Sequence, residues 1–219
     1  MQGFNSFYAS FSTSDMAYEI LEIINARVCP YCNRQYTFTA RKNEVRVRPQ
    51  FDHFFPQSLY PYLAISVYNL IPSCALCNCG KREAFPKNIL YPYEESFESK
   101  GIRFAVDDII PYLLGDKDNV NVTLTPSNPS DIAVLDTIKE YYKEFKIKIL
   151  YDEHADYIKD LILKKCIFNS SAMKSIYNSY SDVLECQQRL EQLIFGKYEV
   201  DDFINNPLSK FTSDVFNDI

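Results

Sequence analysis

Two Cys-x-x-Cys pairs constrain the fold of this 219-residue chain more than any other feature. A turn with two intervening residues lets both sulfurs of a pair reach one metal ion, so two such pairs are typical of a four-thiolate zinc site. A redox-active Cys-x-x-Cys is the competing interpretation, but redox chemistry needs only one pair. The sequence therefore predicts structural Zn²⁺ at the base of the loop 33–73, held by Cys29, Cys32, Cys74 and Cys77.

The remaining cysteines and the N-terminus bear on the cellular compartment. Seven cysteines, an odd number, fit metal binding better than a disulfide framework. Cys79 is near enough to replace Cys77 as a ligand, though with less suitable geometry, and Cys166 and Cys186 are expected in a helical core. The chain shows no signal peptide and no apolar run long enough to cross a bilayer. We therefore expect a cytoplasmic protein.

Charge is distributed unevenly along the chain, whose net charge is −6. Residues 27–87 carry nine basic and three acidic side chains, whereas the remainder carries 14 basic and 26 acidic ones. Both cysteine pairs lie in the basic stretch. Because the acidic remainder repels polyanions, we expect non-specific binding of nucleic acid by the isolated chain to be weak.

Hydrophobic periodicity predicts an α+β protein. A helix is expected from Ser14 or Asp15 to Asn25, and Cys74 is expected to begin a short helix that ends near Glu83. Strands are predicted at 35–39, 45–51, 102–106 and 120–124, with a turn at 41–44 and a mostly irregular segment at 52–73. Helices are predicted at 132–151, 154–169, 171–195 and after Pro207. We divide the chain into an N-terminal helical segment (1–28), a candidate catalytic unit (29–90) and a mainly helical region for partner docking or core completion (91–219).

Polar side chains with catalytic potential lie inside the zinc-closed loop and directly after it. Asp52 and His53 end a predicted strand, Asn69 follows in the loop, and Asn78 comes directly after Cys77. Lys81 and Arg82 lie on the same predicted helical face as Asn78. Taken singly, these residues fit a turn, a loop hydrogen bond or a solvated helix face. Together, and in this order, they form a candidate hydrolytic site.

The order Asp52-His53, Asn69 and Cys74-x-x-Cys77-Asn78-x-x-Lys81 resembles the ββα-metal motif of the HNH endonuclease superfamily in its zinc-knuckle form. Asparagine replaces the last histidine of the motif, which is a common variant. The fuller string is similar to the PtuB nucleases of Septu anti-phage systems, which also occur beside retrons. The resemblance covers residues 29–83, about a quarter of the chain. It implies an HNH core with a four-cysteine zinc site, surrounded by N- and C-terminal α-helices.

The resemblance also implies a mechanism of phosphodiester hydrolysis. One Mg²⁺ or Mn²⁺ ion would be held by Asp52 and Asn78, and would neutralise charge on the leaving oxygen. His53 would act as general base on the attacking water, and Asn69 or its backbone carbonyl would orient the imidazole. Lys81 and Arg82 would bind the phosphate group of the substrate.

Partners and substrate follow from the same resemblance. It implies an ATPase subunit of the PtuA type that gates the nuclease, a nucleic-acid substrate, and, in retron-linked systems, the reverse transcriptase with its msDNA. DNA and RNA, such as tRNA, both stay open as substrates. Two alternatives also stay open: a zinc ribbon that binds nucleic acid without cleaving it, and an assembly subunit whose helices dock onto a partner.

Overall fold

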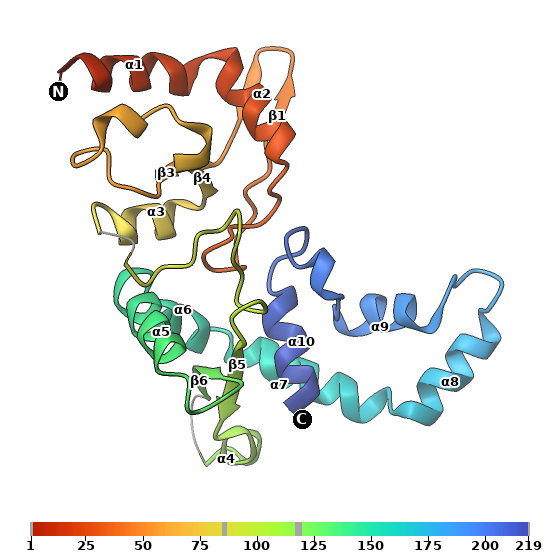
Figure 1. The fold of residues 1–219 in the computed structure, drawn as a ribbon. Coiled ribbons are helices and arrows are strands. Elements are labelled where there is room, and N and C mark those ends of the chain that lie inside the picture. The colour runs from red at the N-terminus through yellow and green to blue at the C-terminus, as the bar shows by residue number, and fades with distance from the viewer. Residues whose placement is uncertain (1, 85–86, 117–119, 219) are drawn as a thin grey trace.

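The structure, a computed structural model, describes residues 2–84, 87–116 and 120–218 (Figure 1). The N-terminal helices, the strands of residues 40–73 and helix α3 (Ala75–Lys81) form the upper part of the view in Figure 1. Extended segments lead from there to a lower part that contains the remaining strands and most of the helices. Helices α8 (Ser170–Ser179) and α9 (Gln187–Phe195) extend away from the other elements of the lower part.

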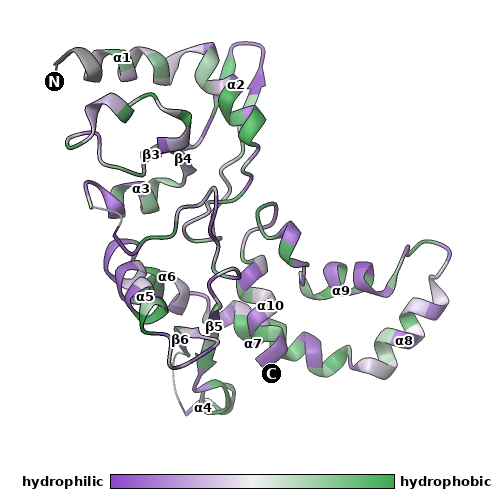
Figure 2. Ribbon diagram, in the orientation of Figure 1, coloured by the Kyte–Doolittle hydropathy of each residue, from purple (hydrophilic) through white to green (hydrophobic). Residues whose placement is uncertain are grey.

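Two helices begin the chain. Helix α2 (Asp15–Ile24) follows Ser14 and ends at Asn25, whose left-handed backbone (φ 49°) closes the last turn, and this confirms the predicted helix. Helix α1 (Gln2–Thr13) was not predicted from the sequence. Tertiary packing accounts for it, since its Tyr8 and Phe11 lie against a small apolar cluster of Ala17, Leu21, Phe51 and Leu70. Figure 2 shows apolar stretches in α2 and in the segment between β3 (Gln50–His53) and β4 (Leu70–Ser73).

The strands that carry the candidate site form two small sheets. The hairpin of β1 (Ala40–Lys42) and β2 (Val45–Val47) turns at Asn43, inside the predicted 41–44 turn, but its first strand lies after the 35–39 segment predicted for it. Strand β3 (Gln50–His53) pairs antiparallel with β4 (Leu70–Ser73), and α3 (Ala75–Lys81) follows directly. The expectation of an irregular 52–73 segment is therefore wrong at both ends, which belong to β3 and β4. Pro72 argued against a strand in the sequence, because proline is tolerated only at the edges of a sheet. In a two-stranded sheet both strands are edge strands, so Pro72 is accommodated.

A third antiparallel pair and the helices make up the rest of the described chain. Strands β5 (Ile102–Asp107) and β6 (Asn121–Pro126) confirm the two strands predicted here, and the short helix α4 (Ile109–Leu114) lies between them. The remaining helices are α5 (Ile132–Glu144), α6 (Ile147–Asp152), α7 (Ala155–Ile167), α8 (Ser170–Ser179), α9 (Gln187–Phe195) and α10 (Ser209–Asp218). Three 3₁₀ turns are η1 (Pro61–Leu63), η2 (Val67–Asn69) and η3 (Val200–Asp202).

Two of the predicted long helices are each interrupted. The helix predicted at 132–151 is divided into α5 and α6 by Lys146, which has a positive φ of 55°. The helix predicted at 171–195 is divided into α8 and α9 by residues 180–186. The first break lets both α5 and α6 contact β6, and the second lets α9 contact both α7 and α8. Hydrophobic periodicity detects neither break.

One hydrophobic core joins the cysteine region to the helical region. The Tyr31 ring stacks on Phe145 with a centroid distance of 4.5 Å, and the Tyr151 hydroxyl donates a hydrogen bond of 2.6 Å to the Cys32 carbonyl. Helix α3 also approaches α5 so closely that a Cβ on Gly80 would lie 2.5 Å from the Glu144 carbonyl oxygen. The candidate catalytic unit is thus packed against the C-terminal region rather than separated from it.

Candidate functional site

The four cysteines of the two predicted pairs come together in the structure. Their ligand atoms all lie within 4.8 Å of one another, and all four residues are buried. The Sγ atoms of Cys32 and Cys74 are 3.9 Å apart. A tetrahedral zinc site with Zn–S bonds of about 2.3 Å has sulfurs about 3.8 Å apart, so this cluster fits zinc. Cys79, Cys166 and Cys186 are exposed, and the expectation that the last two are core residues is wrong.

The first knuckle is a short hairpin closed by a β-bridge between Val28 and Tyr36. The backbone N–H of Asn33 donates to the carbonyl of Cys29 (2.8 Å), and Asn33 takes a left-handed conformation (φ 47°) that turns the chain after Cys32. The Asn33 side chain then donates to the Phe203 carbonyl (2.7 Å) and accepts from the backbone N–H of Lys210 (3.1 Å). The knuckle is therefore anchored to the start of α10.

The second knuckle is the N-terminus of α3. Cys74 is the N-cap residue, and its sulfur accepts from the backbone N–H of Cys77 at 3.5 Å. Hydrogen bonds from the neighbouring thiols, that of Cys29 first, lower the pKa of Cys74. Burial raises the pKa of Cys29, and its contact with Cys77 raises the pKa of Cys77. A bound cation favours the thiolate form of its cysteine ligands, and four sulfurs are a donor set that Zn²⁺ accepts.

Asp52 points inward from β3, and both of its carboxylate oxygens interact with buried side chains. The Tyr31 hydroxyl donates to Oδ2 (2.6 Å), and the Lys81 Nζ lies 3.2 Å from Oδ1 and 3.1 Å from Oδ2. Lys81 also donates to the backbone carbonyl of His53 (2.7 Å), and burial lowers the pKa of its ammonium. Lys81 is 1% exposed and paired with Asp52, so the expectation that it binds phosphate needs correction. Helix α3 docks onto β3 and directs Lys81 into the protein.

His53 lies on the other face of β3, because successive residues of a strand point to opposite faces. Its ring meets the ring of Tyr8 from α1 edge-on, with centroids 4.5 Å apart. Its Nε2 lies 2.9 Å from the carbonyl oxygen of Ala64, and burial lowers the pKa of the imidazole. Since a carbonyl can only accept, the proton is assigned to Nε2, and Nδ1 is then the basic nitrogen.

Asn69 fastens the loop that carries Ala64. Its side-chain oxygen accepts from the backbone N–H of Phe55 (2.7 Å), and its amide donates to the carbonyls of Phe55 (3.1 Å) and Leu63 (3.2 Å). Its own carbonyl accepts from the backbone N–H of Phe54 (2.9 Å). Asn69 therefore reaches His53 through the backbone at Leu63 and Ala64, and it holds the loop rather than the ring itself.

Asn78 and Arg82 lie on the outer side of α3. The Asn78 amide donates to the Gln50 side chain (2.8 Å), while the exposed Arg82 donates to the Cys79 carbonyl (3.1 Å). The pair predicted to hold Mg²⁺ or Mn²⁺ does not fit that ion in this arrangement. The carboxylate of Asp52 is already paired with the Lys81 ammonium group. The Asn78 side chain contacts Gln50 through its amide nitrogen, whereas a metal ion would need the amide oxygen, so the misfit lies at Asp52.

Three residues near the site were missed by sequence reasoning, namely Tyr8, Tyr31 and Arg48. The guanidinium of Arg48 lies 5.4 Å from the centre of the Phe51 ring and donates to the Pro49 carbonyl (2.9 Å). In the described ranges it has no carboxylate within ion-pair distance, whereas Arg41 and Arg46 pair with Glu22 and Asp15. Its place just before the Asp-His strand was the only available signal.

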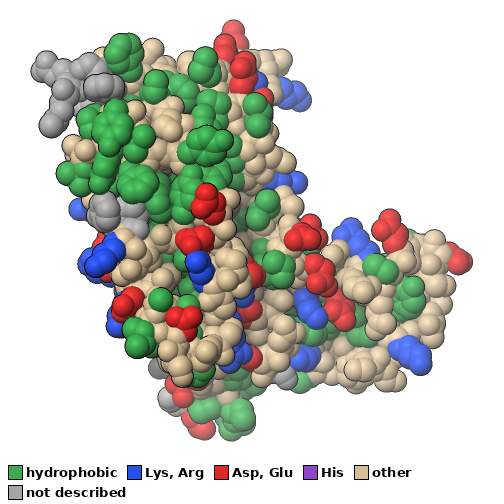
Figure 3. All heavy atoms as spheres, viewed as in Figure 1, with side chains coloured by type: hydrophobic (Ala, Val, Ile, Leu, Met, Phe, Trp, Pro, Cys, Tyr) green, Lys and Arg blue, Asp and Glu red, His purple; other side chains and the backbone are tan. Residues whose placement is uncertain are grey.

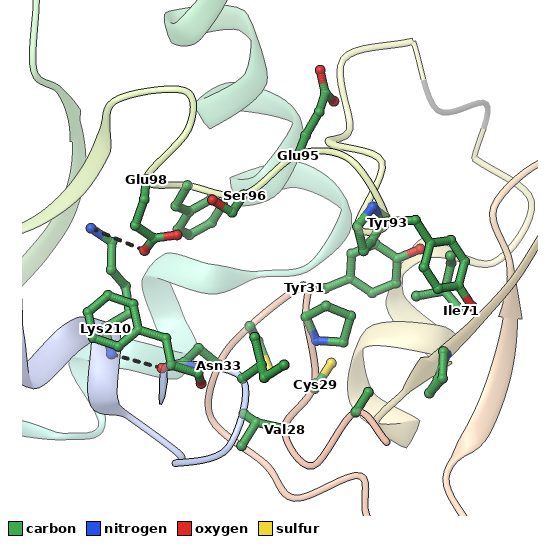
Figure 4. Close-up of a pocket in the computed structure, with 18 of the residues that line it drawn as sticks. Val28, Cys29, Tyr31, Asn33, Ile71, Tyr93, Glu95, Ser96, Glu98 and Lys210 are labelled. Carbon is green, nitrogen blue, oxygen red and sulfur yellow. Dashed lines mark hydrogen bonds and ion pairs between the residues drawn. The ribbon is translucent and has the colours of Figure 1, made fainter. Parts of the chain in front are cut away.

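A cavity of about 290 Å³ lies beside the first knuckle and is lined mainly by apolar side chains (Figure 4). Its wall includes Cys29 and Tyr31 on one side and Tyr93 on another, and the Glu98–Lys210 ion pair (3.4 Å) borders it. His53, Asn69 and Asn78 are not among its lining residues. The cavity is therefore distinct from the candidate catalytic residues.

Comparisons of this chain with protein-family models, with curated proteins and with solved structures found no match. Across the described ranges, every helix is too short or too polar to cross a bilayer.

Proposed function

We propose that this chain is an HNH-type nuclease that hydrolyses phosphodiester bonds in nucleic acid, with His53 as the general base. One observation carries the proposal: the Nε2–H of His53 is held by the Ala64 carbonyl at 2.9 Å, which leaves Nδ1 as the base. The order β3, β4, α3, with the cysteine cluster at its base, and the resemblance to HNH motifs support the same assignment.

In this mechanism, each protein group has a separate task. Nδ1 of His53 takes a proton from a water molecule, whose oxygen attacks the phosphorus while the opposite P–O bond breaks. The departing oxygen takes up a proton from solvent. Arg48, which flanks the same strand and has no acidic partner in the described ranges, binds the phosphate. Asn69 positions His53 by holding the loop from Phe55 to Leu63.

The deciding experiment incubates the zinc-loaded chain together with the neighbouring ATPase, and in parallel alone, with plasmid DNA and with total RNA, each with and without Mg²⁺ or Mn²⁺. His53→Ala is expected to lose about 10²–10⁴-fold in cleavage rate, the usual contribution of a general base. The matched control is His154→Gln, at the other histidine of the chain, which we expect to cleave normally. Cleavage of neither substrate, or equal cleavage by His53→Ala, would refute the proposal.

The resemblance also supports a role as the effector of an anti-phage defence complex with an ATPase partner. A specific surface favours docking to such a partner. Residues 54–80 contain no Asp, Glu, Lys or Arg, and in this segment Leu59, Tyr62 and Tyr68 are 60%, 65% and 77% exposed. Figure 3 shows apolar side chains gathered over the same upper part of the molecule. An uncharged aromatic surface suits a protein better than a phosphate backbone.

The docking role is tested by co-purification with the neighbouring ATPase. Tyr62→Glu and Tyr68→Glu should each abolish the complex, because they place charge in an apolar interface. Val183→Glu is the matched control, since Val183 is 80% exposed between α8 and α9. If all three variants bind the ATPase equally well, this surface is not the docking site.

A further inference from the structure

An ion pair closed to solvent joins α3 to β3. The Lys81 and Asp52 side chains are 0% and 2% exposed, with Nζ 3.1 and 3.2 Å from the two carboxylate oxygens. The third donor direction of the ammonium is used by the His53 carbonyl at 2.7 Å. An ammonium has three donors, so Lys81 is saturated in this position. The Tyr31 hydroxyl completes the ring of donors around Asp52 at 2.6 Å.

The surroundings of Asp52 already neutralise its charge. A carboxylate removed from water requires a cation or several donors, and both are present here. A magnesium ion would need a carboxylate oxygen at about 2.0–2.1 Å and would keep several of its own water molecules. Asp52 is 1% exposed, so there is no solvent-filled space for those waters. An ion placed there would also confront the ammonium of Lys81.

We infer that Lys81 is the built-in cation of Asp52, and that a divalent metal ion does not bind Asp52 unless Lys81 withdraws. This inference concerns the cation at Asp52 and does not depend on the proposed nuclease activity. It separates this chain from a site in which the aspartate is a permanent metal ligand. Any metal dependence of cleavage then requires a rearrangement of α3 against β3, or an ion that arrives with the substrate.

The test measures Mn²⁺ binding to the zinc-loaded full chain, using electron paramagnetic resonance to count free Mn²⁺. The wild type, Asp52→Asn and the exposed control Lys87→Met should show the same bound Mn²⁺ at millimolar concentration. Lys81→Met should gain one site per chain, and the double variant Asp52→Asn/Lys81→Met should lose it again. A wild-type Mn²⁺ site that disappears in Asp52→Asn overturns the inference. A zinc-loaded Lys81→Met chain that gains no site also overturns it.

Lys81→Met leaves a buried carboxylate without its cation, so folding has to be checked by zinc content and thermal unfolding. Where that variant loses zinc, the stability of the three variants decides. Each single variant should melt below the wild type, and the double variant should recover most of the lost Tm because both charges are gone. A double variant no more stable than Lys81→Met shows that Asp52 and Lys81 do not neutralise each other, and the inference fails.

Discussion

The Nε2 atom of His53 lies 2.9 Å from the carbonyl oxygen of Ala64, and this contact links the imidazole to the loop between β3 and β4. The loop is fixed at both ends by Asn69, which bonds to the backbone of Phe55 and Leu63. The tautomer of His53 therefore depends on a backbone group that is held by another side chain. This arrangement makes Asn69 a positioning residue for the proposed reaction.

Replacement of Asn69 should reduce catalysis without removing the base. Asn69→Ala deletes three hydrogen bonds and lets Ala64 shift, and a misplacement of about 1 Å can cost about 10²-fold in rate. We expect kcat to fall about 10²-fold with KM little changed, measured on whichever nucleic acid the wild type cleaves. Asn128→Ala, at a remote turn, is the control. A rise in KM with unchanged kcat would mean that Asn69 serves substrate binding.

Removal of one zinc ligand should unload the metal and destabilise the fold. Structural zinc sites contribute about 10–16 kcal/mol of apparent binding free energy, which is available for folding. Cys29→Ser should therefore lose bound zinc and melt at a much lower temperature, as measured by elemental analysis and thermal unfolding. Cys79→Ser is the control, because Cys79 is exposed and outside the cluster. Zinc loss in Cys79→Ser instead would identify Cys79 as a ligand.

The Tyr31 hydroxyl should stabilise the folded state through Asp52. Tyr31→Phe keeps the stack on Phe145 but leaves a buried carboxylate oxygen without this donor, which costs about 1–3 kcal/mol. Denaturant unfolding should show this decrease in the free energy of unfolding. Tyr36→Phe, which alters an exposed ring, should change the free energy of unfolding by less than about 0.5 kcal/mol. Equal stability of the two variants would argue against a stabilising Tyr31–Asp52 bond.

Because α3 approaches α5 closely, a larger residue at Gly80 should destabilise the folded state. Alanine favours a helix over glycine by about 1 kcal/mol, but its Cβ would lie 2.5 Å from the Glu144 carbonyl oxygen. Overpacking of this kind costs about 1–3 kcal/mol, so Gly80→Ala should lower the free energy of unfolding. The same denaturant titration measures it. A stabilised Gly80→Ala variant would show that α3 can move away from α5 without loss.

The pair of Arg34 and His154 should make stability depend on pH. Arg34 Nε donates to His154 Nε2 at 3.0 Å, and burial, followed by the charge of Arg34, lowers the pKa of His154. Because the folded pKa lies below the unfolded value of about 6.5, the unfolded state takes up the proton first. The contribution is thus complete above about pH 6.5 and is lost as the pH falls below it. Unfolding titrations from pH 7.5 to about 5.5 should show a weaker pH dependence for His154→Gln than for the wild type. Parallel curves would exclude His154 as the source.

Particular elements show how much of the fold local sequence can predict. Helix α2, the β1–β2 turn, the start of α3 and the strands β5 and β6 follow from periodicity and capping residues, which act over a few residues. Strand β4 and helix α1 do not follow from such local signals, since their conformation depends on partners far away in the chain. In β4, Pro72 pairs with Phe51, and in α1, Tyr8 packs against the cluster that contains Phe51 and Leu70. The breaks at Lys146 and at 180–186 are likewise accompanied by contacts between separate elements, α6 with β6 and α9 with α7.

The candidate site divides in the same way. The sequence alone determined that the four cysteines form one cluster, because a spacing of two residues sets the local geometry of each pair. It also pointed to His53 and Asn69 as candidate site residues. Only the tertiary structure decided that Lys81 lies against Asp52 and that Asn69 acts through Ala64. Those directions depend on the pleat of β3 and on how closely α3 and the 54–69 loop pack against it, and long-range packing leaves no mark on residue spacing.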